Sequence, residues 1–249
     1  MHCSEFFNLF VRVEHNMKLN NTHVTLSLLK QINLLAGLSD AALEAIIPKI
    51  KVLSLSKGEY LFHKGAESSE LYFLLNGSLQ VLDYTPEGQL IGLAVIRPGW
   101  HVGEMAVLDD EPRSASIMAE KDSELLYLSH KHALELFTHE PIVALRVMRG
   151  LVSIIRKDNN VRAIIAIPNA KVRVYRYLMS IATEVEGEMH INNLPKHSAL
   201  ASICNTSRET VSRALSELQK NQIASKLNTH DWVIDASALE LFIENIVFD

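Results

Sequence analysis

The chain has 249 residues, 48% of them hydrophobic, which is enough to bury more than one core, so one large or two smaller domains are expected. Its formal net charge is −5, and overall charge alone therefore does not indicate a nucleic-acid-binding protein. Cys3 and Cys204 lie far apart, which excludes a disulfide framework and a four-cysteine metal cluster and favours a reducing compartment.

The N-terminal segment shows no export or membrane signal. It carries Glu5 where a secretory signal needs positive charge, and it lacks a small-residue cleavage site. No uninterrupted apolar run reaches about 18 residues, so the sequence predicts no transmembrane helix. We expect a cytoplasmic protein that does not associate with membranes.

The first part of the chain predicts little regular structure. Residues 1–30 are weakly patterned and are assigned to an N-terminal arm. The segment LSDAALEAII, residues 38–47, then predicts a helix that Ser39 caps, with Leu43, Ile46 and Ile47 on one apolar face.

A β-rich pattern follows over residues 52–129. Short apolar alternations such as LYFLL at 71–75 are separated by glycines at a spacing of roughly 8–12 residues, which is typical of an antiparallel sandwich or jelly roll. The Asn-Gly-Ser sequence at 76–78 is turn chemistry and predicts a hairpin turn. We assign the β-roll to residues 31–138.

A long helix is predicted next, and Pro168 would end it. We assign residues 139–168 to a dimerisation helix, because apolar positions recur there in steps of 4, 3, 4, 3 and 4, the heptad spacing that pairs two helices. One charged residue, Asp158, interrupts this pattern. The seam positions are Val147, Leu151, Ile154, Asp158, Val161 and Ile165.

The segment GEMAVLDDEPRSAS, residues 103–116, combines residues suited to a sugar phosphate. Gly103 allows close backbone approach, and an arginine such as Arg113 inside a β-sandwich needs an anion because an unpaired buried charge is costly. A phosphate fits the planar fork of arginine, and the Glu104 carboxylate can accept a hydrogen bond from a sugar hydroxyl. The alternative is an ordinary Arg–Glu ion pair on the surface of the β-roll.

This segment resembles the phosphate-binding cassette of cyclic-nucleotide-binding domains, and KGEYLFHKG at 57–65 resembles their early strands. The resemblance implies that Glu104 holds the ribose 2′-hydroxyl and Arg113 the cyclic phosphate of cAMP, with cGMP as a possible ligand. The other residues that it implies at the ligand are Gly103, Met105, Ser114 and Ala115.

Residues 197–226 predict a helix-turn-helix. Leu200 lies on the inner face of the first helix, Asn205 tolerates the left-handed turn, and Ser207 caps the second helix. In the second helix we expect an inward face of Val211, Ala214, Leu215 and Leu218. An arginine and a glutamate in that helix's first turn match the base-edge code, in which arginine reads guanine and glutamate accepts from cytosine. The alternative is an amphipathic helix pair with solvated charges. The candidate DNA-binding residues are Lys196, Ser207, Arg208, Glu209, Ser212 and Arg213.

The heptapeptide SRETVSR at 207–213 resembles the recognition helix of the Crp/Fnr family of bacterial transcription regulators, and residues 223–235 would form a wing. The resemblance covers residues 38–235 and predicts an α+β protein: an N-terminal β-roll that binds a cyclic nucleotide, a long dimerisation helix and a C-terminal winged helix-turn-helix domain at 169–249. It implies a homodimer that binds double-stranded DNA at a palindromic operator and contacts RNA polymerase.

The chain departs from the family pattern in two places. His197 stands where cAMP-responsive members often carry a phosphate-contacting arginine, and Asp158 and Asn159 stand where those members carry Thr-Ser. A carboxylate only accepts hydrogen bonds, and guanine offers two donors where adenine offers one amino group. We therefore expect Asp158, with Asn159, to contact the base and to make cGMP a better competitor than it is in Thr-Ser relatives.

Other chemistries find less support. His139-Glu140 runs into Pro141, so no His-Glu-x-x-His helix forms, and no nucleophile elbow or P-loop is present. We predict no metal site and no enzyme activity. Two alternatives remain: the same architecture with another effector or none, which Asp158 supports, and a cyclic-nucleotide sensor that acts on a protein partner without binding DNA.

Overall fold

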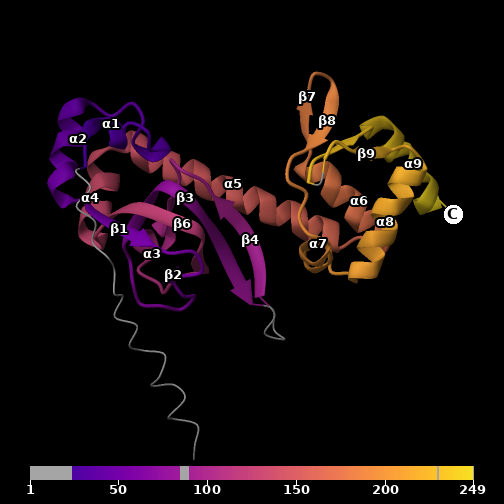
Figure 1. Cartoon of the computed structure of the whole chain (residues 1–249), viewed down its shortest axis with the longest axis horizontal. Coiled ribbons are helices and arrows are strands. Elements are labelled where there is room, and N and C mark those ends of the chain that lie inside the picture. The colour runs from indigo at the N-terminus through magenta and orange to yellow at the C-terminus, as the bar shows by residue number, and fades with distance from the viewer. Residues whose placement is uncertain (1–23, 85–89, 229, 249) are drawn as a thin grey trace, which may run out of the picture. The chain divides into compact units, whose positions relative to one another are not determined.

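The computed structural model describes residues 24–84, 90–228 and 230–248, with side chains up to residue 246. Most of the N-terminal arm assigned to residues 1–30 lies outside these ranges. The chain divides into two compact units, Met1–Met148 and Arg149–Asp249 (Figure 1). No helix among the described residues is long and apolar enough to cross a membrane.

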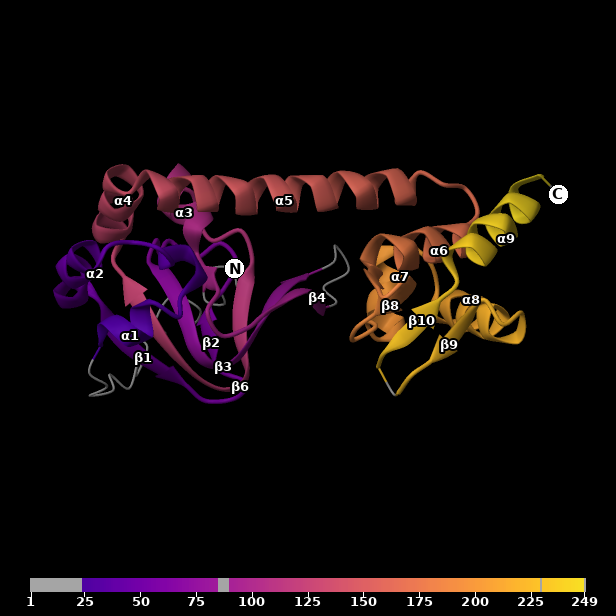
Figure 2. The same cartoon turned by 90° about the horizontal axis from the view of Figure 1, so that it is seen from above.

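The N-terminal unit begins with short helices. They are α1 (Leu26–Leu29), η1 (Asn33–Leu35), α2 (Asp40–Ile46) and η2 (Ile47–Lys49). The predicted cap of α2 is confirmed, because Ser39 Oγ accepts from the Ala42 N–H at 3.2 Å. Leu29 and Leu43 are fully buried. These helices lie beside one end of the β-sheet (Figures 1 and 2).

The predicted antiparallel β-roll is confirmed. Its strands are β1 (Lys51–Leu55), β2 (Tyr60–Phe62), β3 (Leu71–Tyr84), β4 (Leu90–Ile96), β5 (His101–Val102) and β6 (Ser116–Leu128). The order is β1-β6-β3-β4, with β2 paired to β6 and β5 to β3, all antiparallel. Its core contains fully buried side chains from three of these strands, among them Leu53, Leu79 and Leu125.

The hairpin turn predicted at Asn-Gly-Ser 76–78 is wrong. These residues lie inside β3, where the pairing with β6 shifts register. Gly77 has φ +95°, and a Cβ there would collide with Ser123 of β6. The glycine thus permits an irregularity in a continuous strand, which is the other common use of a strand glycine.

Three helices complete this part of the chain: α3 (Glu104–Asp109), α4 (His130–His139) and α5 (Pro141–Ile165). The helix assigned to residues 139–168 thus begins at Pro141, because proline is favoured at the first position of a helix and restrains the residue before it. Helix α5 ends at Ile165, a few residues before Pro168, for the same reason.

The C-terminal unit contains four further helices and a small sheet. They are α6 (Ala170–Ile181), β7 (Thr183–Val185), β8 (Glu188–Ile191), α7 (His197–Ile203), α8 (Arg208–Lys220), β9 (Ala224–Lys226), β10 (Trp232–Ile234) and α9 (Ala236–Phe248). The antiparallel sheet has the order β7-β8-β10-β9. Tyr175, Leu218 and Trp232 belong to one apolar core in this unit. The winged helix-turn-helix predicted from the sequence is confirmed.

Candidate functional site

The predicted cassette pairs with the segment that precedes it by about fifty residues. The Arg113 N–H donates to Ala66 O at 3.0 Å, and the Gly65 N–H donates to Arg113 O at 2.8 Å. The Lys64 N–H donates to Ser116 Oγ at 2.9 Å. The two stretches that carry the cassette resemblance, residues 57–65 and 103–116, are thereby brought together.

At Gly103 the backbone packs closely against other parts of the protein. It precedes α3 with φ +91°, a left-handed conformation that favours glycine. A Cβ at this position would lie 2.7 Å from Glu70 O. Beyond it, Met105 is exposed, and Ser114 Oγ donates to Met105 Sδ at 3.5 Å.

Arg113 is buried, and each of its side-chain nitrogen atoms donates to another part of the protein. Nε donates to Ser68 Oγ at 2.9 Å and Nη1 to Gly103 O at 3.1 Å. Nη2 donates both to Glu70 O at 3.0 Å and to the Glu70 carboxylate at 3.2 Å. The guanidinium carbon lies 4.1 Å from the centroid of the Phe62 ring. The buried cation is thus held on several sides.

Glu104 lies at the start of α3 and is half-buried, as is Ala115. Within the described parts of the chain its carboxylate makes no hydrogen bond or ion pair. Burial lowers the pKa of Arg113, while the nearby Glu70 and Glu104 carboxylates and the Tyr72 hydroxyl oppose that shift. The Glu104 carboxylate and the Arg113 guanidinium therefore lie close together, and of the two only the guanidinium is hydrogen-bonded within the described structure.

Sequence reasoning missed Glu70 and Ser68. An Arg–Glu ion pair does exist here, as the alternative interpretation had it, but its carboxylate belongs to Glu70 rather than to Glu104. The two partners are 43 residues apart, so no helical or strand periodicity in the sequence predicts their contact. The only available signal was that a buried arginine needs several acceptors.

Asp158 and Asn159 are both exposed on α5. The middle of this helix carries apolar side chains that face solvent in the single chain, with Met148 54% and Ile155 58% exposed. Val152 and Ile154 are also exposed, whereas Val147 is buried. The exposed stripe therefore matches the predicted seam only in part: Ile154, Asp158 and Ile165 are exposed, but Val147 is buried and Leu151 and Val161 are half-buried. The most exposed apolar side chains, Met148, Val152 and Ile155, lie one residue further on.

The helix-turn-helix has the predicted geometry. Asn205 adopts φ +46° between α7 and α8, and Ser207 Oγ accepts from the Thr210 N–H at 3.1 Å to cap α8. The inward face of α8 is confirmed by Val211 and Leu218, both fully buried. All six candidate DNA-binding residues are exposed: Lys196, Ser207, Arg208, Glu209, Ser212 and Arg213.

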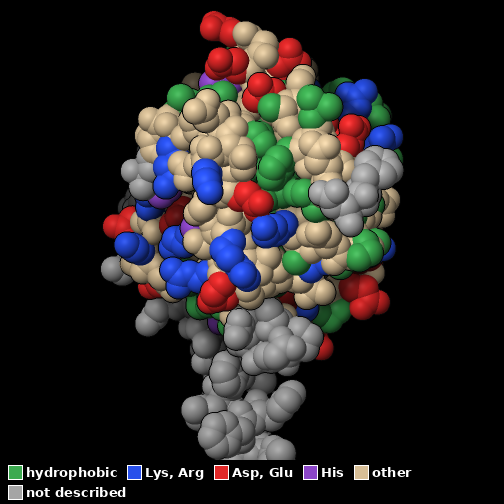
Figure 3. Space-filling view, turned by 90° about the vertical axis from the view of Figure 1, so that its right-hand side faces the viewer, with side chains coloured by type: hydrophobic (Ala, Val, Ile, Leu, Met, Phe, Trp, Pro, Cys, Tyr) green, Lys and Arg blue, Asp and Glu red, His purple; other side chains and the backbone are tan. Residues whose placement is uncertain are grey.

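An open cleft of about 460 Å³ lies between the start of α7, the start of α8 and the wing formed by β9 and β10. Residues 196–226 hold five basic and two acidic residues, although residues 169–249 are slightly acidic overall. Lys and Arg side chains gather on one side of the face in Figure 3. The cleft is lined by Leu194, Pro195, Lys196, His197, Ser198, Arg208, Lys226, His230 and Trp232. Lys226 and His230 were not predicted from the sequence.

Arg173 of α6 fixes the turn of this motif. Its Nε and Nη2 donate to the carbonyl oxygens of Cys204 and Asn205, both at 2.7 Å. Its Nη1 donates to Ile167 O at 2.8 Å and to Pro168 O at 3.1 Å, in the link that follows α5. One side chain thus joins the end of that link to the turn before the recognition helix.

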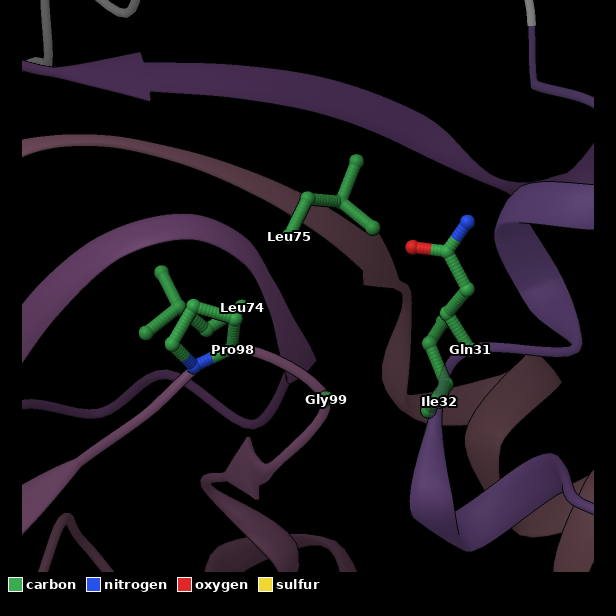
Figure 4. Close-up of a pocket in the computed structure, with 6 residues that line it drawn as sticks. All are labelled: Gln31, Ile32, Leu74, Leu75, Pro98 and Gly99. Atoms are coloured by element: carbon green, nitrogen blue, oxygen red, sulfur yellow. The ribbon is translucent and has the colours of Figure 1, made fainter.

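A smaller cavity of about 120 Å³ lies in the N-terminal unit, lined by Gln31, Ile32, Leu74, Leu75, Pro98 and Gly99 (Figure 4). None of these residues belongs to the predicted sites. Among the described residues, no group of three or more His, Cys, Asp or Glu side chains could hold a metal ion. Burial raises the pKa of the Cys204 thiol to about 11, so this cysteine stays protonated near neutral pH.

Comparison with known proteins identifies both domains. The cyclic nucleotide-binding domain family matches residues 52–140, and the Crp-like helix-turn-helix domain family matches residues 172–242. The cyclic AMP receptor protein of Thermus thermophilus is 31% identical over 167 residues, 67% of this chain and 76% of that protein. The chain belongs to the Crp/Fnr family of transcription regulators.

Two further proteins are similar to this chain at lower identity. A CRP-like cAMP-activated global transcriptional regulator of Mycobacterium tuberculosis is 21% identical over 194 residues, 76% of this chain and 87% of the relative. A CooA mutant from Carboxydothermus hydrogenoformans shares the fold, with a TM-score of 0.66, 19% identity and coverage of 91% of this chain and 98% of that one.

Membership of the Crp/Fnr family defines the general function. The chain is a ligand-responsive, DNA-binding transcription regulator whose N-terminal domain is of the cyclic-nucleotide-binding type. Regulators of this family are not enzymes, as the sequence also indicated.

Proposed function

We propose that this regulator binds cAMP in the cassette of residues 103–116, with cGMP as a competing ligand. Glu104 would accept from the ribose 2′-hydroxyl, and Arg113 would hold the cyclic phosphate. The observation that carries the proposal is the buried guanidinium of Arg113 close to a half-buried Glu104 whose carboxylate has no bond in the described structure. The ligand named for two relatives, a cyclic AMP receptor protein and a cAMP-activated regulator, supports cAMP.

The remaining contacts follow the cassette and the long helix. The backbone at Gly103 and the Ser114 hydroxyl would reach the phosphate, with Met105 and Ala115 beside it. Asp158, helped by Asn159, would contact the base, which explains a carboxylate on the predicted helix seam. Because that carboxylate only accepts, guanine would satisfy it with two donors and adenine with one.

Calorimetric titration of the full chain with cAMP and cGMP tests this proposal. We expect wild-type protein to bind both nucleotides and Arg113→Lys to lose at least about tenfold in affinity, because lysine cannot form a bidentate pair with phosphate. Circular dichroism of Arg113→Lys checks that the fold is kept. Unchanged affinity in the folded variant, or no binding of either nucleotide to the wild type, contradicts the proposal.

We further propose that the protein acts in the cytoplasm as a homodimer on a palindromic operator and that it contacts RNA polymerase. The exposed apolar stripe of α5 supports pairing of two chains, with residues 139–168 as the dimerisation helix. Two-fold symmetry would place two copies of α8 in major grooves about one helical turn apart. Arg208 and Glu209 would read bases, and Lys196 would contact phosphate.

One observation favours the alternative of another effector or none. Arg113 already pairs with an anion of the protein itself, the Glu70 carboxylate. A regulator that uses this pair only for stability would bind operator DNA equally well with and without nucleotide. A cyclic-nucleotide sensor that acts on a protein partner, by contrast, would bind nucleotide but not DNA. Nucleotide titration and DNA binding with and without nucleotide therefore distinguish the cyclic-nucleotide-dependent regulator from both alternatives.

A further inference from the structure

The hydrogen bonds of Arg113 leave little room for a phosphate. A guanidinium has five N–H donors, and four hydrogen bonds to the protein are present in the structure. Both N–H groups of Nη2 point to Glu70, one to its carbonyl and one to its carboxylate. A single N–H, on Nη1, is left. Bidentate binding of a phosphate needs two parallel N–H groups, so at least one of the present acceptors has to leave.

The four acceptors differ in how easily they can move. The carbonyl oxygens of Gly103 and Glu70 are part of the backbone, where Gly103 already has a left-handed conformation. The Ser68 side chain is short, so its hydroxyl can move only a small distance. The Glu70 side chain is 36% exposed, whereas that of Arg113 is 1% exposed. Rotation of Glu70 into water therefore restores hydration to its carboxylate, and Arg113 stays in place.

The surroundings of Glu70 also resemble an anion site that its own carboxylate fills. The Tyr72 hydroxyl donates to the same Glu70 oxygen, Oε2, at 3.4 Å. Arg113 and Tyr72 thus supply a cation and a hydroxyl donor to one negatively charged group. An anionic ligand that displaced the carboxylate would meet the same two donors.

From these contacts we propose that Glu70 is an internal competitor for the anion site: its carboxylate binds Arg113 in the unliganded protein and must release it before a phosphate can bind. This inference rests on the proposed function, since it concerns the phosphate of the cyclic nucleotide. It gives Glu70 the role of setting the ligand affinity. When no ligand is bound, Glu70 compensates the buried charge of Arg113 and so stabilises the folded protein.

The expected effect of removing the charge is moderate. Glu70→Gln keeps the shape of the side chain and its acceptor oxygen but replaces a charge-assisted bond with a neutral one. A half-exposed ion pair is worth about 1 kcal/mol or somewhat more, which corresponds to an affinity for phosphate about three- to tenfold higher in the variant. The matched control is Glu67→Gln, which removes the same charge from a nearby exposed position.

The test is calorimetric titration of full-length wild type, Glu70→Gln and Glu67→Gln with cAMP and with cGMP. We expect Glu70→Gln alone to bind both nucleotides about three- to tenfold more tightly, since the same competition applies to each. Unchanged or weaker binding in Glu70→Gln would overturn the inference, because Glu70 would then orient Arg113 rather than compete for it.

A second measurement keeps this test apart from the identity of the nucleotide. The melting temperature of the same three proteins is recorded with increasing inorganic phosphate at constant ionic strength. We expect phosphate to stabilise Glu70→Gln at lower concentrations than it stabilises wild type or Glu67→Gln. If no protein binds cAMP or cGMP, the proposed function fails while this phosphate response still decides the role of Glu70. Equal phosphate responses in the three proteins would overturn that role.

Discussion

Replacement of Arg173 by methionine tests how the turn of the helix-turn-helix is held. The variant keeps the aliphatic stem in α6 but removes four hydrogen bonds to backbone carbonyls. Two of these bonds lie in partly buried surroundings, and the other two lie where water can replace the donor. At about 0.5–1.5 kcal/mol for each partly buried bond, the free energy of unfolding of the C-terminal unit should fall by about 1–3 kcal/mol.

Urea denaturation of the full chain measures this loss. Trp232 is buried in the C-terminal unit, and the chain's other tryptophan, Trp100, is exposed in the N-terminal unit. Fluorescence in a Trp100→Phe background therefore reports on the C-terminal unit. The control is Arg176→Met on the same helix, which removes a partly exposed ion pair with Glu240 and should cost less than about 1 kcal/mol. Equal losses in the two variants would refute the reasoning.

Three further predictions concern single residues. Ser207→Ala removes the cap of α8 and should lower the free energy of unfolding by about 1 kcal/mol in the same urea assay. Burial lowers the pKa of His101, so below pH 6.5 the unfolded chain binds a proton that the folded chain does not bind, and the free energy of unfolding should fall. In denaturation series at several pH values, His101→Phe should reduce this dependence of stability on pH. Ile155→Asp places a charge on the exposed stripe of α5 and should convert dimers to monomers in analytical ultracentrifugation, whereas Lys157→Asp, a polar position on the same helix, should not.

The sequence was sufficient for features encoded by local patterns. The caps at Ser39 and Ser207, the left-handed Asn205 and the inward face of α8 each depend on residue type and spacing within one or two turns. The cassette could be proposed from the sequence because Gly103 and Arg113 lie in one short segment.

Features that depend on distant strands were not predictable. The residue types of Asn-Gly-Ser at 76–78 are typical of turns, but β3 pairs with β6 on both sides of this segment. An irregularity in the strand pairing at Gly77 therefore replaces the turn. The pairing of Glu70 with Arg113 and the bonds of Arg173 to the turn at Cys204 likewise join residues far apart in the chain. Only the folded structure brings these groups together.

The central claim is that a cyclic nucleotide changes the affinity of this protein for DNA. The most direct measurement is fluorescence anisotropy of a palindromic duplex that the protein itself has selected from a random pool, titrated with and without saturating cAMP. Coupling free energies of this kind correspond to about 5–150-fold in affinity, so cAMP should strengthen binding within that range in wild type and not in Arg113→Lys. Equal affinity of the wild-type protein with and without cAMP or cGMP would contradict the account.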